Sequence, residues 1–123
     1  MLKSLLIVGA GSFVGGVLRY CVSMLMKTVC GQGFPWGTLL VNLSGCFVFG
    51  LMFALLGKWN AQNGPWLLFL TTGLCGGFTT FSAFAHESVQ MLHNEEFLAF
   101  FCYVFASAAL GFLLMGLGYF VAK

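Results

Sequence analysis

The chain has 123 residues, of which 60% are hydrophobic and only 7% charged, with a net charge of +2 and a mean hydropathy of +0.99. Soluble domains carry about 25% charged residues, so this composition excludes an ordinary soluble globule and a disordered chain, and the small net charge excludes an electrostatic binder of nucleic acid. The composition therefore predicts an integral membrane protein surrounded by lipid.

The few charged residues divide the chain into four apolar segments. Each segment is at least as long as the ~20 residues that a helix needs to cross a bilayer. The predicted spans are residues 2–26, 36–57, 66–90 and 97–121, within a single transmembrane domain that covers residues 1–123. The sequence therefore predicts an all-α membrane protein with four transmembrane helices.

The first span carries Gly11, Gly15 and Arg19 at a spacing of four, so the three share one helix face. Small residues at this spacing predict close packing against another helix. A guanidinium in an apolar segment is costly, so Arg19 is predicted either to anchor the helix at an interface or to line a pore. The segment lacks a small-x-small cleavage site, which favours a span over a cleaved signal peptide.

The second span is preceded by a predicted turn around Gln32 and followed by a predicted loop at residues 58–65. Its notable residue is Asn42, near the middle of the span. An amide at this depth needs a hydrogen-bond partner. Two interpretations remain open, a bond that joins two helices or a position along a polar path.

The third span contains Gly76 and Gly77, followed by Thr79 and Thr80. Glycines and β-branched residues are poor helix formers, so we predict a helix broken near the middle of the membrane. Such backbone is tolerated there only where it is buried in protein or lines a cavity. The freed carbonyls suit a hard cation, which prefers oxygen ligands. The alternative is a kink packed against a neighbouring helix.

Phenylalanines follow at intervals of three, and two of them, Phe81 and Phe84, have polar neighbours such as Ser82. An aromatic ring has a positive edge, so these rings are predicted to line an anion path. They would do so without a fixed cation, which would hold a small anion too tightly to release it. The alternative is a stripe that packs or faces lipid.

Residues 86–96 are predicted as a solvated loop that holds all three acids and both histidines. In the fourth span, Tyr103, Ser107 and Gly111 share one face and present two hydroxyl groups. The five cysteines are odd in number and form no metal-binding motif. They are predicted to be small packing residues within the helices.

The distribution of lysine and arginine gives only a weak orientation under the positive-inside rule. The chain also lacks an internal repeat of the kind that gives many transporters their inverted symmetry. Two oppositely inserted copies would supply that symmetry. The sequence therefore predicts a dual-topology, antiparallel homodimer.

Three segments carry a resemblance to a known family. They read GGVLRY from Gly15, GTLLVNLSG from Gly37, and GLCGGFTTFS from Gly73 followed by Phe84. With four spans around them, these segments resemble the Fluc/CrcB family of bacterial fluoride channels over nearly the whole chain. The third segment is the most specific.

The resemblance implies an antiparallel homodimer in the bacterial inner membrane, with two pores that export fluoride passively and so confer fluoride resistance. It implies a structural sodium ion held by backbone carbonyls of both subunits. The residues it assigns are Asn42, Phe81, Phe84, Tyr103 and Ser107 for the fluoride pore, Gly76 and Thr79 for sodium, and Arg19 for the first span. Ala83 and His86 depart from the family pattern and leave the vestibule chemistry open.

Two other functions compete with this reading. A small proton-coupled multidrug exporter needs a carboxylate within the membrane, and we expect none because Glu87 is predicted near the end of the third span. A structural four-span subunit would use Asn42 and the glycines to hold helices together. An enzyme is the least expected class, since no acid–base pair, activated nucleophile or metal cluster lies in the spans.

Overall fold

The computed structural model describes residues 1–31, 33–59 and 64–123, and every regular element in these ranges is helical. In chain order the elements are α1 (Leu2–Cys30), α2 (Trp36–Lys58), α3 (Pro65–Leu67), the π-helix η1 (Leu68–Cys75), α4 (Gly76–Phe78), α5 (Phe81–His93) and α6 (Phe97–Ala122). The predicted turn at Gln32 and the part of the predicted loop at residues 60–63 lie outside the described residues.

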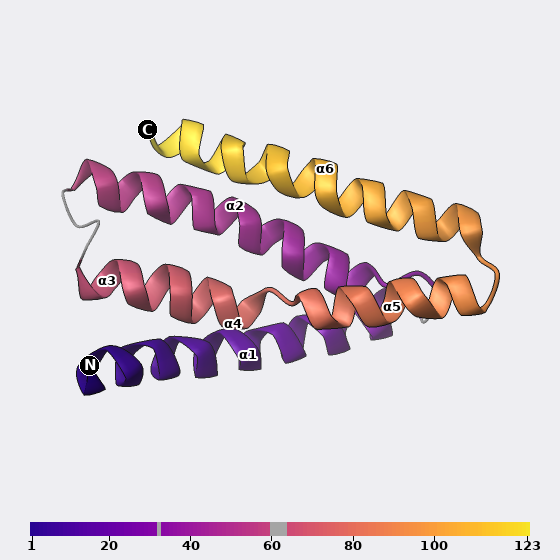
Figure 1. The fold of residues 1–123 in the computed structure, drawn as a ribbon, viewed down its shortest axis with the longest axis horizontal. Helices are drawn as coiled ribbons and strands as arrows, with labels where there is room; N and C mark the ends of the chain where they lie inside the picture. The colour runs from indigo at the N-terminus through magenta and orange to yellow at the C-terminus, as the bar shows by residue number, and fades with distance from the viewer. Residues whose placement is uncertain (32, 60–63) are drawn as a thin grey trace.

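Four helical segments are long and apolar enough to cross a membrane: Leu2–Cys30, Trp36–Lys58, Pro65–His93 and Phe97–Ala122. The third segment consists of α3, η1, α4 and α5, which follow one another along one line (Figure 1). The N- and C-termini lie at the same end of the bundle (Figure 1). The prediction of an all-α chain with four spanning helices is confirmed.

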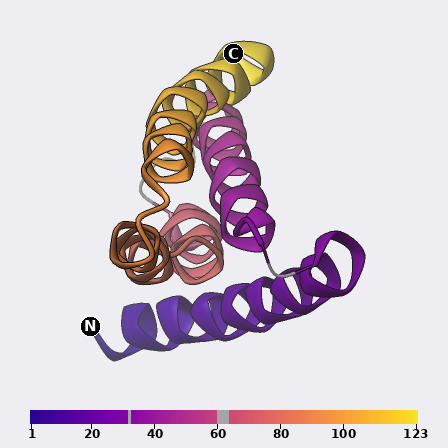
Figure 2. The same ribbon diagram turned by 90° about the vertical axis from the view of Figure 1, so that its right-hand side faces the viewer.

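The four spans pair in two groups. Helix α6 packs along α2, and α1 packs on η1 and α4, as the two perpendicular views show (Figures 1 and 2). Glycines allow both approaches. A Cβ atom at Gly50 would overlap the backbone of Met115, and one at Gly118 would overlap the backbone of Phe47. The α2–α6 pair is therefore held at backbone contact distance.

The contact between α1 and the third span also depends on glycines. A Cβ atom at Gly11 would lie 2.7 Å from the carbonyl oxygen of Phe69, and one at Gly77 would lie 2.7 Å from the carbonyl oxygen of Ser12. Gly15 faces the same surface, where a Cβ atom would overlap the Leu74 carbonyl. The predicted packing face of the first span is confirmed.

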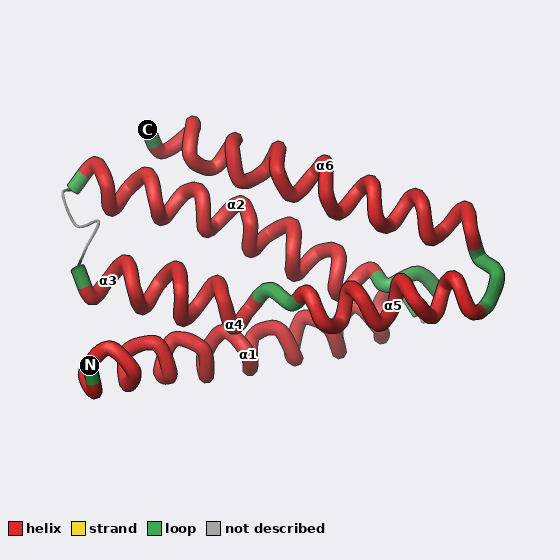
Figure 3. The backbone as a smooth tube through the Cα atoms, in the orientation of Figure 1, coloured by secondary structure: helices red, strands yellow, loops and turns green. Residues whose placement is uncertain are grey.

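The helical course of the third span is interrupted between α4 and α5, at Thr79 and Thr80 (Figure 3). Both residues have extended backbone, with ψ angles of 156° and 120°. Of the four poor helix formers on which the predicted break rested, Gly76 and Gly77 are helical and belong to α4, and only the two threonines are extended. Gly77 meets the backbone of α1, and the extended segment falls on the β-branched residues that favour it.

Helix α5 continues to His93, so the prediction of a loop over residues 86–96 was wrong. Only residues 94–96 connect α5 to α6. The physical reason is tertiary packing, which the pattern of residues along the sequence did not reveal. Ser88 and Met91 are buried, and Met91 belongs to a core cluster with Leu39 and Tyr103.

Candidate functional site

A cavity of about 660 Å³ lies where α2, the third span and α6 meet. Six of the eight residues that the sequence assigned to a site line this cavity. They are Asn42, Gly76, Thr79, Phe81, Phe84 and Ser107. Tyr103 and Arg19 do not line it. The fold thus gathers residues from three separate helices around one space.

The Asn42 amide is bonded to the backbone of Thr80, across the interruption in the third span. Its Nδ2 donates to the Thr80 carbonyl at 3.0 Å, and the Thr80 N–H donates to its Oδ1 at 2.7 Å. The side chain therefore joins two helices, as one of the two interpretations required. An asparagine amide carries two hydrogens, so one N–H remains for a ligand in the cavity.

The two phenylalanines differ in their surroundings. Their ring centroids lie 5.8 Å apart with planes inclined at 52°. The Phe84 ring packs on Tyr103, with 5.0 Å between centroids. The Phe81 side chain is 78% exposed, and its neighbours along the chain, Thr80 and Ser82, are polar. The rings thus form one continuous aromatic surface from the subunit exterior to its core.

Ser107 is distinctive because its hydroxyl oxygen is buried and has no hydrogen-bond partner among the described residues. A buried hydroxyl without a partner costs roughly 1–3 kcal/mol, and such groups in native structures call for an explanation. Because Ser107 lines the cavity, an occupant of that cavity is the natural partner for its hydroxyl.

Tyr103 is fully buried and takes part in a hydrogen-bond network that the sequence analysis missed. Its hydroxyl donates to Oε1 of Glu87 at 3.0 Å, and the Thr38 hydroxyl donates to Oε2 of the same carboxyl at 3.0 Å. Two spacings were available as signals. Thr38 lies one helical turn before Asn42, and Glu87 lies three residues after Phe84.

Replacing Tyr103 by phenylalanine removes one donor from the Glu87 carboxyl. We expect a loss of about 1–2 kcal/mol in the free energy of unfolding, the usual range for a lost hydrogen bond to a charged, half-buried acceptor. Thermal denaturation in detergent measures this loss. Tyr119→Phe is the matched control, since Tyr119 is 44% exposed and its hydroxyl bonds to no described residue. Equal melting temperatures for both variants would contradict the importance of the network.

Arg19 is half-buried and contacts the third span from the side of α1. Its Nε donates to the carbonyl oxygen of Gly77 at 3.1 Å. This carbonyl lies at the end of α4, where regular helical bonding stops. The guanidinium therefore satisfies a carbonyl of the interrupted helix and stands outside the cavity lining.

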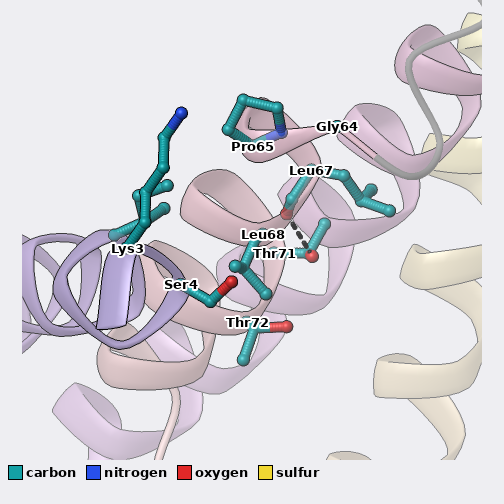
Figure 4. A pocket seen from close by; sticks show the side chains of 9 residues that line it. Lys3, Ser4, Gly64, Pro65, Leu67, Leu68, Thr71 and Thr72 are labelled. Atoms are coloured by element: carbon teal, nitrogen blue, oxygen red, sulfur yellow. Dashed lines mark hydrogen bonds between the residues drawn. The ribbon is translucent and has the colours of Figure 1, made fainter. Parts of the chain in front are cut away.

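A second cavity of about 430 Å³ lies between the start of α1 and the start of the third span. Lys3 and Ser4 approach it from α1, and Thr72 approaches it from η1 (Figure 4). Thr71 and Thr72 line both cavities. The larger cavity is thus adjacent to one whose lining includes a lysine ammonium.

No group of three or more His, Cys, Asp or Glu side chains among the described residues is arranged to hold a metal ion. A cation at the larger cavity would therefore take oxygen ligands from the backbone or from hydroxyls. Gly76 and Thr79 both line that cavity, beside the interruption. Their carbonyls have the chemistry that a hard cation prefers.

Comparison with known proteins identifies the family. Residues 6–119 match the family described as CrcB-like protein, Camphor Resistance (CrcB).

Proteins named "Fluoride-specific ion channel FluC" are similar to the chain over most of their length. The relative from Flavobacterium psychrophilum is 38% identical over 99% of this chain and 98% of its own length. The one from Phocaeicola vulgatus is 40% identical over 99% of this chain and 100% of its own length. The one from Thermus thermophilus is 41% identical over 93% of this chain and 90% of its own length. The chain therefore belongs to the CrcB-like protein family.

Proposed function

We propose that this protein is a fluoride-specific ion channel, a multi-pass protein of the bacterial inner membrane that exports fluoride passively. The family membership and the names of the relatives support the assignment. The observation in this chain that carries it is the cavity, which brings the unpartnered Ser107 hydroxyl next to Asn42, Phe81 and Phe84. The protein is a transporter and catalyses no reaction.

The proposed path replaces the water of a small, strongly hydrated anion with weak donors. The Ser107 hydroxyl and the remaining Asn42 N–H donate hydrogen bonds, and the phenylalanine edges add a positive electrostatic surface. Within the part of the chain that the structure describes, no lysine or arginine lines this cavity. An anion is therefore held firmly enough to enter and loosely enough to leave. The membrane potential then drives fluoride out of the cytoplasm.

We propose that Tyr103 acts beside this path through the network it forms with Glu87 and Thr38. The Tyr103 ring supports Phe84 from behind, with a centroid separation of 5.0 Å. Arg19 holds the end of α4 through Gly77. Both are positioning roles, since neither residue lines the cavity.

The functional unit is proposed to be an antiparallel homodimer with two pores. Phe81 is 78% exposed on one subunit and Gly76 is also exposed, although both line the cavity. A second subunit would cover this face and complete the enclosure. The interruption at Thr79 and Thr80 would then lie near the middle of the membrane, within the assembly.

A structural sodium ion is proposed at this interface, held by the carbonyls of Gly76 and Thr79 from both subunits. Sodium would supply a fixed positive charge that holds the two interrupted helices together. The two residues lie on either side of Gly77 and Phe78, at the end of regular helical bonding. Carbonyl oxygens at such a position fit a hard cation.

The first test is efflux from liposomes that contain only the purified protein and are loaded with fluoride or with chloride. Potassium with valinomycin relieves the membrane voltage. We expect rapid loss of fluoride with retention of chloride. Retention of both anions by liposomes that hold verified, folded protein would overturn the channel assignment and favour a structural subunit.

The exporter alternative is not excluded by the position of Glu87, because the structure places this carboxyl inside a spanning helix. Glu87 accepts hydrogen bonds from Thr38 and Tyr103 on its two oxygens. Each of its two oxygens therefore accepts a hydrogen bond from one of the protein's own hydroxyls. Family membership, rather than the absence of an embedded acid, now favours the channel.

A further inference from the structure

The interruption in the third span has an unusual pattern of hydrogen bonds. In a continuous α-helix each N–H donates to the carbonyl four residues earlier. The Thr80 N–H would then bond to Gly76, and the Ala83 N–H would bond to Thr79. Instead, the Thr80 N–H donates to Oδ1 of Asn42 at 2.7 Å, and the Ala83 N–H donates to Oγ1 of Thr80 at 3.2 Å. Both donors are thus diverted to side chains.

The diversion leaves particular carbonyls open. The Cys75 carbonyl accepts the Thr79 N–H and the Thr79 hydroxyl, each at 2.9 Å. The Gly77 carbonyl accepts Arg19, and the Thr80 carbonyl accepts Asn42. Among the described residues, nothing donates to the remaining carbonyls of this stretch, those of Gly76, Phe78 and Thr79. Two of these three are the proposed sodium ligands.

We propose that Asn42 and the Thr80 side chain are positioning residues that keep the Gly76 and Thr79 carbonyls open for the cation. Each side-chain oxygen accepts a hydrogen bond from a backbone N–H. Without that oxygen, the N–H would donate to one of these two carbonyls. The inference rests on the proposed cation site and assigns a new task to Asn42. The Asn42 amide anchors the backbone of the interruption to α2, and the Asn42 side chain also faces the cavity.

The consequence of losing either oxygen follows from the cost of an unpaired buried N–H. Without the Thr80 hydroxyl, the Ala83 N–H gains a partner by turning to the Thr79 carbonyl, which lengthens α5. Without the Asn42 amide, the Thr80 N–H gains a partner by turning to the Gly76 carbonyl, which lengthens α4. In a homodimer, each change removes two of the four proposed carbonyl ligands.

The test compares Thr80→Val with Thr80→Ser. Valine keeps the branched shape and lacks the hydroxyl, whereas serine keeps the oxygen. Thermal denaturation of the purified dimer is measured in detergent while sodium chloride replaces N-methylglucamine chloride stepwise. Ligand binding to the folded state raises stability in a concentration-dependent way. We expect wild type and Thr80→Ser to gain stability at similar sodium concentrations. Thr80→Val should need about tenfold more sodium or gain nothing, as expected for the loss of oxygen ligands.

This readout separates positioning from simple helix capping. Loss of the cap alone lowers the melting temperature equally in both salts, because it does not involve sodium. Only a change in the sodium-dependent increment supports the proposal. An unchanged increment in Thr80→Val would overturn the role of Thr80.

A second pair of variants covers the case in which Thr80→Val does not fold. Asn42→Asp keeps an acceptor oxygen for the Thr80 N–H, and Asn42→Leu removes it. We expect the sodium increment to persist in the first variant and to disappear in the second. A normal increment in Asn42→Leu would overturn the role of Asn42. Wild type without any sodium increment, but with intact fluoride efflux, would remove the cation site and this inference and leave the channel assignment standing.

Discussion

Replacing Phe81 by isoleucine is expected to lower fluoride efflux by about tenfold or more while leaving the proposed dimer folded. The exposed Phe81 side chain has few packing partners within its own subunit to lose. Isoleucine is similarly apolar but has no positively polarised ring edge. An electrostatic contact of about 1.4 kcal/mol at the rate-limiting barrier corresponds to a tenfold change in rate. Liposome efflux measures the loss, and size-exclusion chromatography verifies the dimer.

Phe112→Ile is the matched control, since Phe112 is 81% exposed and lies on α6 away from the cavity lining. It should leave efflux near the wild-type rate. Phe84→Ile should also lower efflux and, in addition, lower stability, because the Phe84 ring packs on Tyr103. Wild-type efflux from a folded Phe81→Ile dimer would remove this ring from the permeation mechanism.

The four spans were predictable because charge is so scarce in this chain. Lipid tolerates few charged groups, so most of the charged positions, Arg19 and Glu87 excepted, marked where apolar helices had to end. The main residues of the cavity could also be predicted from the sequence. Asn42 and the threonines around Gly76 stood out, because polar groups and poor helix formers are costly in a spanning segment. The resemblance to a known family then gave these residues their expected roles.

The sequence carried only partial signals for the network of Thr38, Glu87 and Tyr103, namely the spacings of Thr38 from Asn42 and of Glu87 from Phe84. Glu87 was assigned to a solvated loop because it precedes two further acids, Glu95 and Glu96, and a histidine-containing stretch. Its true surroundings come from α2 and α6, which supply the two hydroxyl donors. Such a contact among three helices depends on their packing, which the spacings along the single helices do not determine.

The position of the helix interruption shows the same limit. Propensity pointed to Gly76 and Gly77 and to the threonines that follow them, and the extended residues are Thr79 and Thr80. Close packing on α1 gives Gly77 a reason to stay helical, since any Cβ atom there would meet the Ser12 backbone. The Asn42 amide then supplies partners for the extended backbone of Thr80. Tertiary contacts thus place the break at the threonines rather than at the glycines.

Exchanging Gly15 for alanine is expected to be among the most destabilising single-methyl changes in the chain. A Cβ atom there would overlap the carbonyl oxygen of Leu74 and lie 2.8 Å from the backbone nitrogen of Phe78. Backbone atoms cannot rotate away as a side chain can, so α1 must move off the third span. Overpacking of this kind costs about 1–3 kcal/mol.

Gly16→Ala is the control that isolates this cost. A Cβ atom at Gly16 meets nothing within 4 Å. Both substitutions change the intrinsic helix propensity equally, by about 1 kcal/mol in favour of alanine in water, so the difference between them reports the packing alone. We expect Gly15→Ala to melt at a lower temperature than wild type and Gly16→Ala to melt at the wild-type temperature or above it.

Displacement of α1 would also pull Arg19 from the Gly77 carbonyl, which lies at 3.1 Å. Gly15→Ala should therefore lose fluoride efflux together with stability, and equal behaviour of the two variants would show that α1 is free to move without disturbing the interrupted helix.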